Sequence, residues 1–198
     1  MVLNHIWGLY AHPKEEWHSI EKRHESGMYS LIHIMTIALI PAICGYYAAA
    51  HIGWSIGSGE PIKLTQDSAM MLAVAMYVAL IVGVFALAYL IKWMAVTFDS
   101  TPNFTQCLEL AAYAATPLLM VGITALFPIL WFVVLAGLGA VCYSIYLLYS
   151  GVPIMMDIPE EKGFIYASSV VTCGLILMVT ILAATAMMWT SGFGPEYL

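Results

Sequence analysis

A stretch near the amino terminus, HPKEEWHSIEKRHES (residues 12–26), concentrates side chains that bind divalent metal ions. It holds three of the chain's six histidines and four of its twelve carboxylates. Imidazole and carboxylate groups are preferred ligands of zinc and related transition metals. Glu15 with His18 and Glu21 with His24 also repeat the Glu-x-x-His spacing that dimetal sites use where several helices converge. These residues indicate a candidate site for a divalent transition metal.

The positions of these histidines on a helix limit that hypothesis. Pro13 suits the first position of a helix, and two glutamates follow in the first turn, so we predict an amphipathic helix from about residue 13. His12, His18 and His24 are six residues apart, which turns successive rings by about 240° around a straight helix. A metal would therefore need ligands from several segments: His5, His12, His18, Glu21, His24, Asp157, Glu160 and Glu161. The alternative is a solvated interfacial helix that binds no metal.

The composition places the chain in a membrane. Of its 198 residues, 62% are hydrophobic and 9% are charged, and the mean hydropathy is +0.89. A soluble domain carries about 25% charged residues. Apolar stretches of roughly 20 residues cross the hydrocarbon core as helices, because each backbone amide must be satisfied within the segment. Five stretches qualify, near residues 29–51, 68–98, 104–126, 128–149 and 164–189.

We therefore predict an all-α integral membrane protein. Residues 29–189 form a domain of five transmembrane helices, preceded by an amphipathic interfacial helix within residues 1–28 and followed by a tail at residues 190–198. Lysine and arginine accumulate in cytoplasmic loops. Five of these residues fall in the N-terminal segment and at the second and fourth connections: Lys14, Lys22, Arg23, Lys92 and Lys162. Because the opposite side holds only Lys63, we expect the N-terminus in the cytoplasm and the C-terminus outside.

Two further expectations concern the inner side. In SGVPIMMDIPEEKGF (residues 150–164), Pro153 and Pro159 oppose a continuous helix, and the apolar residues between them suit the headgroup zone. We predict that this connection lies on the membrane surface. Trp17 and Trp93 are expected at the inner interface, where tryptophan is enriched.

Charges inside a bilayer are costly and frequently functional, and the predicted spans hold few ionisable residues. His33, Lys92 and Glu109 lie at similar depths near the inner ends of the first three helices. One interpretation is a relay for protons or cations. The other is a structural ion pair between Lys92 and Glu109, with His33 hydrogen-bonded. We favour the structural interpretation because no polar path continues through the outer half.

Several function classes are disfavoured by the sequence. The formal net charge of -6 opposes nucleic-acid binding, which requires a basic face. The chain shows no Ser-His-Asp order, nucleophile elbow, phosphate loop or H-E-x-x-H motif. We therefore predict no enzymatic activity, and apart from the candidate divalent metal no cofactor is implied.

Four stretches together resemble the YIP family, five-span membrane proteins named for interaction with Ypt/Rab GTPases. They are HIWGLYAHP, IPAICGYYAAAHIGWSIG, AAYAATPLLMVGITALFPILW and YLLYSGVP. The likeness covers nearly the whole chain and is strongest to the small bacterial YohC-like branch. It implies five spans in the bacterial inner membrane, with a cytoplasmic N-terminus and a periplasmic C-terminus. His5 and His12 are the histidines that fall within the shared motif.

The resemblance also implies a function. Eukaryotic members act in membrane trafficking and organelle shape, and they bind Rab proteins through a long N-terminal region. That region spans only residues 1–28 here, so no GTPase partner is expected. The first hypothesis is a non-enzymatic membrane-organising, accessory or scaffold component whose partners are the lipid bilayer and a homo-oligomer or larger membrane complex. The alternative is a protein that binds or transports divalent metal ions through the cytoplasmic-side histidines and carboxylates.

Overall fold

The computed structural model describes residues 2–23, 27–54, 61–188, 190–191, 194 and 196. Two short helices come first, α1 (Val2–Ala11) and α2 (Pro13–Arg23). Five long helices follow: α3 (Gly27–Tyr47), α4 (Gln66–Ala95), α5 (Phe104–Met120), α6 (Leu130–Met155) and α7 (Glu160–Met188). Short turns of π- or 3-10 helix extend three of them: Ala48–Ile52 after α3, Val96–Phe98 after α4 and Val121–Leu126 after α5.

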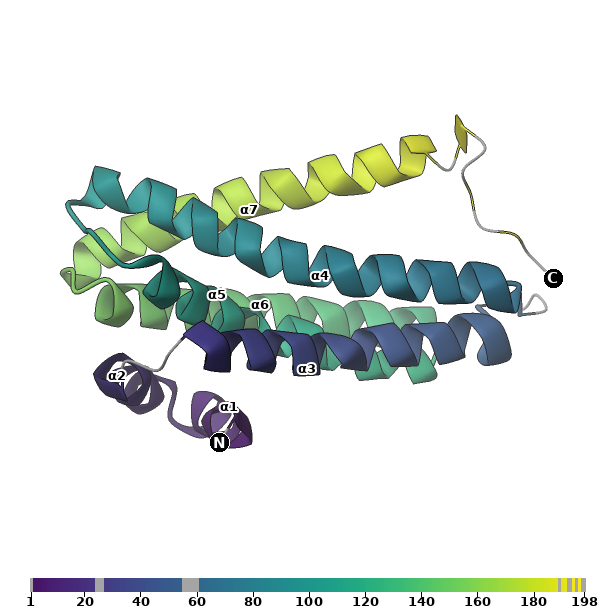
Figure 1. The fold of residues 1–198 in the computed structure, drawn as a ribbon, viewed down its shortest axis with the longest axis horizontal. Helices are drawn as coiled ribbons and strands as arrows, with labels where there is room; N and C mark the ends of the chain where they lie inside the picture. Colours follow the sequence, from purple (N-terminus) through teal and green to yellow (C-terminus); the bar gives the residue numbers. More distant parts are fainter. Residues whose placement is uncertain are drawn as a thin grey trace.

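Each of the five long helices is long and apolar enough to cross a membrane. The predicted fold class, an all-α protein with five such helices preceded by a short helical segment, is therefore confirmed (Figure 1). The long helices run roughly along one direction, whereas α1 and α2 lie beside the bundle near one of its ends (Figure 1).

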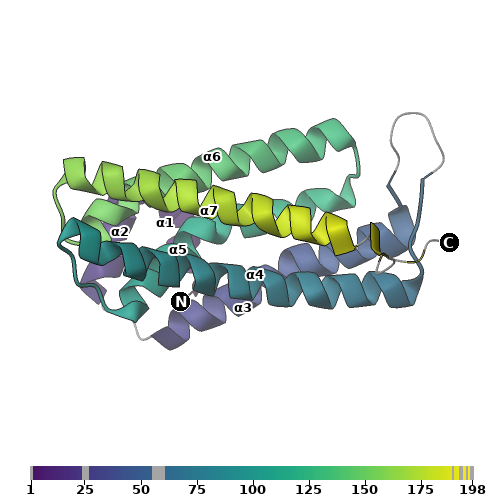
Figure 2. The same ribbon diagram turned by 90° about the horizontal axis from the view of Figure 1, so that it is seen from above.

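Helix α5 forms the centre of the bundle. In its most apolar 18-residue window 61% of the residues are buried, against 6% for α4 and α7 and 11% for α6. Alanines allow neighbouring helices to approach it closely, and four of them are buried on α5: Ala111, Ala112, Ala114 and Ala115. Helices α3, α4 and α6 pack against α5 (Figures 1 and 2). The outer faces of α4, α6 and α7 are consequently left for contact with lipid.

Three segments meet at one end of the bundle, which we call the inner end. Lys162 on α7 donates a hydrogen bond to Asp99 in the α4–α5 connection (Nζ to Oδ2, 2.9 Å). This hydrogen bond lowers the pKa of Asp99 from its usual value. Lys14 on α2 lies 3.6 Å from Glu160 at the start of α7 (Nζ to Oε1). Helix α2 and the α4–α5 and α6–α7 connections therefore share the inner end. The orientation predicted from lysine and arginine requires these three segments to lie on one side.

The α6–α7 connection is shorter than predicted. Helix α6 continues through Pro153 to Met155, and Met156 is buried against the protein (4% exposed). The helix is still interrupted within residues 150–164, as the two prolines predict, since α7 begins only at Glu160. The position of this connection relative to the membrane surface stays a prediction. Asp157 then adopts a left-handed conformation (φ 50°), and Ile158 N donates to Pro153 O (3.1 Å), which closes the helix with a Schellman-type cap.

Candidate functional site

Helix α2 is held against the bundle by Trp17. This side chain is fully buried, and its indole Nε1 donates to Ser150 Oγ on α6 (3.1 Å). Its ring also meets the Tyr113 ring on α5 edge-on, with centroids 6.5 Å apart. Ile20, one turn further along α2, is 2% exposed. Trp17 therefore packs inside the protein at the inner end of the bundle, whereas Trp93 on α4 is 67% exposed. Their location at the inner membrane interface stays a prediction.

The close approach of Trp17 to α6 requires glycine at position 151. A Cβ atom added to Gly151 would lie 2.7 Å from Trp17 Cε2 and 2.7 Å from Leu110 Cδ1, which is too close for non-bonded carbons. The indole cannot move away easily because it is buried on all sides. On the same helix, a Cβ added to Gly139 would meet no atom within 4 Å. The absence of a side chain at 151 thus forms the notch that receives Trp17.

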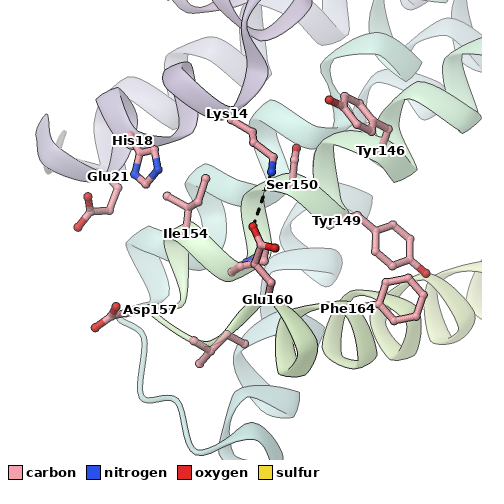
Figure 3. Close-up of a pocket in the computed structure, with 12 residues that line it drawn as sticks. Lys14, His18, Glu21, Tyr146, Tyr149, Ser150, Ile154, Asp157, Glu160 and Phe164 are labelled. Atoms are coloured by element: carbon pink, nitrogen blue, oxygen red, sulfur yellow. Dashed lines mark ion pairs between the residues drawn. The ribbon is translucent and has the colours of Figure 1, made fainter.

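The opposite face of α2 borders a cavity of about 580 Å³ at the inner end. Lys14, His18 and Glu21 line it from α2, as the helical-wheel pattern of alternating faces suggests. The other lining residues come from the end of α6, the connection and the start of α7: Tyr146, Tyr149, Ser150, Pro153, Ile154, Asp157, Ile158, Glu160 and Phe164. Figure 3 shows Lys14 reaching across toward Glu160, with the rings of Tyr149 and Phe164 beside each other. Charged groups and aromatic rings thus share one cavity.

The structure brings together half of the proposed metal ligands. His18, Glu21, Asp157 and Glu160 line the same cavity. His12 is exposed at the junction of α1 and α2, and Glu161 is exposed on α7 and does not line the cavity. The side chain of His5 and the whole of His24 lie outside the described residues. Within the described part of the chain, no three His, Cys, Asp or Glu side chains are grouped closely enough to hold a metal ion.

His33 is buried between α3 and α5 and is hydrogen-bonded to Thr116. Its Nε2 lies 2.9 Å from Thr116 Oγ1, and its ring centroid lies 4.8 Å from that of Tyr113. The Thr116 hydroxyl donates its single hydrogen to Ala112 O on its own helix (3.0 Å). The hydroxyl must then accept from the imidazole, so His33 carries a hydrogen on Nε2.

Glu109 and Lys92 occupy different environments. Glu109 is 3% exposed and lies on the face of α5 that also carries Tyr113 and Thr116, four and seven residues further on. Lys92 is exposed on α4, and its Nζ lies 5.9 Å from the centre of the Phe104 ring. Phe104 precedes Glu109 by five residues, which is about 140° around a helix. Of the three ionisable residues, the structure buries His33 on α3 and Glu109 on α5, and it places Lys92 on an outer surface.

Helix α1 was not expected from the sequence. Tyr143 on α6 donates through its hydroxyl to Leu9 O (2.8 Å), and its ring stacks on that of Tyr10 with centroids 5.1 Å apart. Leu9 is 1% exposed, whereas Trp7 is 77% exposed on the outward side. The apolar run HIWGLYA could have indicated a helix, but it is too short for a span and carries no cap signal. The aromatic side of the cavity was also missed, although Tyr146 and Tyr149 have the i, i+3 spacing of one helix face.

The fold and the site at the inner end are those of a small polytopic membrane protein, with five apolar helices of which α5 is the central one. A family model described as "Yip1 domain" matches residues 7–181. The chain is also 34% identical over 192 residues to inner membrane protein YohC of Escherichia coli K12, covering 96% of this chain and 98% of that protein. The YohC protein of E. coli O6:H1 strain CFT073 gives the same identity and coverage. The chain therefore belongs to the Yip1 family, as its sequence motifs indicated. No solved structure matches the chain.

Proposed function

We propose that the protein organises the bilayer around it, as a membrane-shaping or accessory component without catalytic chemistry of its own. The supporting observation is the position of α1 along α6, from which its depth in the bilayer follows. Tyr143, which contacts Leu9 and Tyr10, lies twelve residues before the last residue of α6, or about 18 Å along the helix axis. Helix α6 has 26 residues, about 39 Å, against a hydrocarbon core of about 30 Å. A position 18 Å from its inner end falls within the inner leaflet.

The two short helices therefore add cross-section in one leaflet only. Trp7 presents an exposed indole on the outward side of α1, where it would contact acyl chains or headgroups. Short helices inserted on one side of a bilayer bind in a way that is sensitive to membrane curvature. An asymmetric wedge carried by a five-helix anchor is a means of bending or organising the surrounding membrane.

The proposed orientation places the inner end in the cytoplasm. It rests on the excess of lysine and arginine in the segments that share this end, which include Lys14 and Lys162. The N-terminus would then be cytoplasmic and the C-terminus periplasmic, with the wedge in the cytoplasmic leaflet of the inner membrane.

Reconstitution into liposomes tests the membrane-shaping proposal. We expect vesicles to become smaller or tubular as the protein-to-lipid ratio rises, measured by electron cryomicroscopy. The Trp17→Ala variant should lose this effect because it frees α2, and α1 with it, from the bundle. Thr180→Val serves as a control, since Thr180 is exposed on α7 and its hydroxyl donates to its own helix (Oγ1 to Ile176 O, 2.8 Å).

Two outcomes would contradict this proposal. The first is that vesicles keep their size at every ratio. The second is that the Trp17→Ala variant shapes them as well as the original protein does, while size-exclusion chromatography shows it folded. Either result would mean that α1 and α2 do not act as a wedge.

The alternative, a divalent-metal protein, is supported by one observation: His18, Glu21, Asp157 and Glu160 line a single cavity. Those side chains would have to move together to share an ion. Elemental analysis of the protein purified in detergent, beside a His12→Ala/His18→Ala variant, tests it. Under our main proposal we expect less than one metal ion per chain in both samples. Stoichiometric metal that disappears in the variant would reverse the ranking of the two functions.

A further inference from the structure

The cavity at the inner end lies beside the last turns of α6, at the end of an apolar helix long enough to span a membrane. It is lined by the last turns of α6, from Tyr146 to Pro153, and by the α6–α7 connection and α2. Phe164, which lines the cavity, and Ile165, which follows it on α7, are 62% and 58% exposed and belong to the apolar outer face of that helix. The cavity is therefore continuous with a lipid-facing surface on one side and borders charged groups on the other.

The charges of the cavity favour a cation. Glu21, Asp157 and Glu160 contribute three carboxylates, and Lys14 contributes one ammonium group. Lys14 lies 3.6 Å from Glu160, but the two side chains are 69% and 85% exposed. An ion pair between such exposed groups is weak, so Glu160 remains able to bind another cation. A ligand with a positive group would neutralise the excess of negative charge.

The aromatic side of the cavity also suits a cation attached to an apolar body. The Tyr149 and Phe164 rings are in contact, with centroids 5.1 Å apart, and the Tyr149 hydroxyl is hydrogen-bonded to Ser168 Oγ at 2.7 Å. This hydrogen bond fixes the Tyr149 ring against α7. Aromatic faces attract cations, and aromatic side chains favour the level of the lipid headgroups. The carboxylates of the cavity thus suit the cationic group of an amphiphile, and its aromatic side suits the apolar part.

We propose that this cavity binds the headgroup of an aminophospholipid such as phosphatidylethanolamine. The primary ammonium group donates hydrogen bonds to Glu21, Asp157 and Glu160, which a quaternary ammonium group cannot do. The phosphate lies toward Lys14 and His18, and the acyl chains continue over the exposed face of α7. The inference is independent of the proposed membrane-shaping function, because a bound lipid requires neither curvature nor a wedge.

Native mass spectrometry in a lipid-exchanging detergent, with a chelator present to remove divalent metal ions, measures this binding. The probes are phosphatidylethanolamine, phosphatidylcholine and phosphatidylglycerol with the same acyl chains, and soluble O-phosphoethanolamine. We expect phosphatidylethanolamine to bind about tenfold more tightly than the other two lipids. The soluble headgroup should bind far more weakly, because it lacks the chains that contact α7.

The Glu21→Gln/Asp157→Asn variant is expected to lose about tenfold in affinity for phosphatidylethanolamine. Asparagine tolerates the left-handed conformation of residue 157, so the helix cap is preserved. Glu15→Gln/Glu161→Gln is the matched control, because it removes the same net charge from exposed residues outside the cavity.

Three outcomes would overturn the proposal. Equal or tighter binding of phosphatidylglycerol would show that the cavity does not select a cation. Equal binding of O-phosphoethanolamine would identify a soluble amine, not a lipid, as the ligand. Equal loss in both double variants would mean that overall charge, not the cavity, determines binding. Because none of these readouts depends on vesicle shape, failure here is distinguishable from failure of the proposed function.

Discussion

Replacing Trp17 with alanine is expected to release α2 from the inner end of the bundle. The indole is fully buried, fills the notch at Gly151 and donates to Ser150. Truncating a buried tryptophan costs about 3–5 kcal/mol. At 1.4 kcal/mol per factor of ten, the equilibrium between docked and undocked α2 should shift by about a hundredfold or more. Trypsin cleavage at Lys14 and Lys22 in detergent micelles measures this opening.

Two variants separate docking by Trp17 from a general loss of tryptophan. Trp7→Ala removes the same side chain from α1, but Trp7 is 77% exposed, so its effect should stay within about 0.5 kcal/mol. Trp17→Phe keeps most of the buried ring and loses the hydrogen bond to Ser150, which costs about 1 kcal/mol. Trypsin should therefore cut Trp17→Ala fastest, then Trp17→Phe, then Trp7→Ala. Equal cleavage rates in Trp17→Ala and Trp7→Ala would show that Trp17 does not hold α2.

The sequence predicts the long helices well because the bilayer imposes a length and an apolar composition on each of them. It also predicts the two faces of α2, since Trp17 and Ile20 fall on one side of a helical wheel and Lys14 and His18 on the other. Helix α1 could not be predicted in this way, because the length that the bilayer imposes applies only to helices that cross it. Its ten residues are too few to span a membrane, and contacts with Tyr143 and its neighbours fix their position.

The candidate site is harder to predict because it depends on how the helices rotate against one another. Composition places His33, Lys92 and Glu109 at one depth, but the rotation of α4 and α5 sends Lys92 to an outer surface and buries Glu109. The cavity likewise depends on how neighbouring helices pack, which the sequence does not show. Tyr149 and Phe164 meet only because α6 continues through Pro153 and turns sharply into α7. The sequence-based prediction from Pro153 and Pro159 was a longer connection, over residues 150–163, and it gave no indication of this contact.

Replacing Thr116 with valine is expected to destabilise the five-helix bundle by about 1–2 kcal/mol. Valine has nearly the same shape as threonine, so packing around α5 should be preserved. The change removes the oxygen that accepts from His33 Nε2 (2.9 Å), and the imidazole is fully buried. A buried donor that loses its acceptor retains its desolvation cost. Unfolding of the protein in mixed micelles with increasing sodium dodecyl sulfate, followed by circular dichroism, measures the difference.

Thr180→Val is the matched control for this substitution. Thr180, like Thr116, donates to the carbonyl four residues earlier on its own helix (Ile176 O, 2.8 Å), but it is exposed on α7 and no buried side chain depends on it. Thr116→Ser keeps the hydroxyl and should retain most of the stability. If Thr116→Val and Thr180→Val lose the same small amount, the hydrogen bond from His33 contributes nothing to the bundle. A larger loss in Thr116→Val alone means that a polar contact between α3 and α5, and not apolar packing alone, holds the centre of the bundle together.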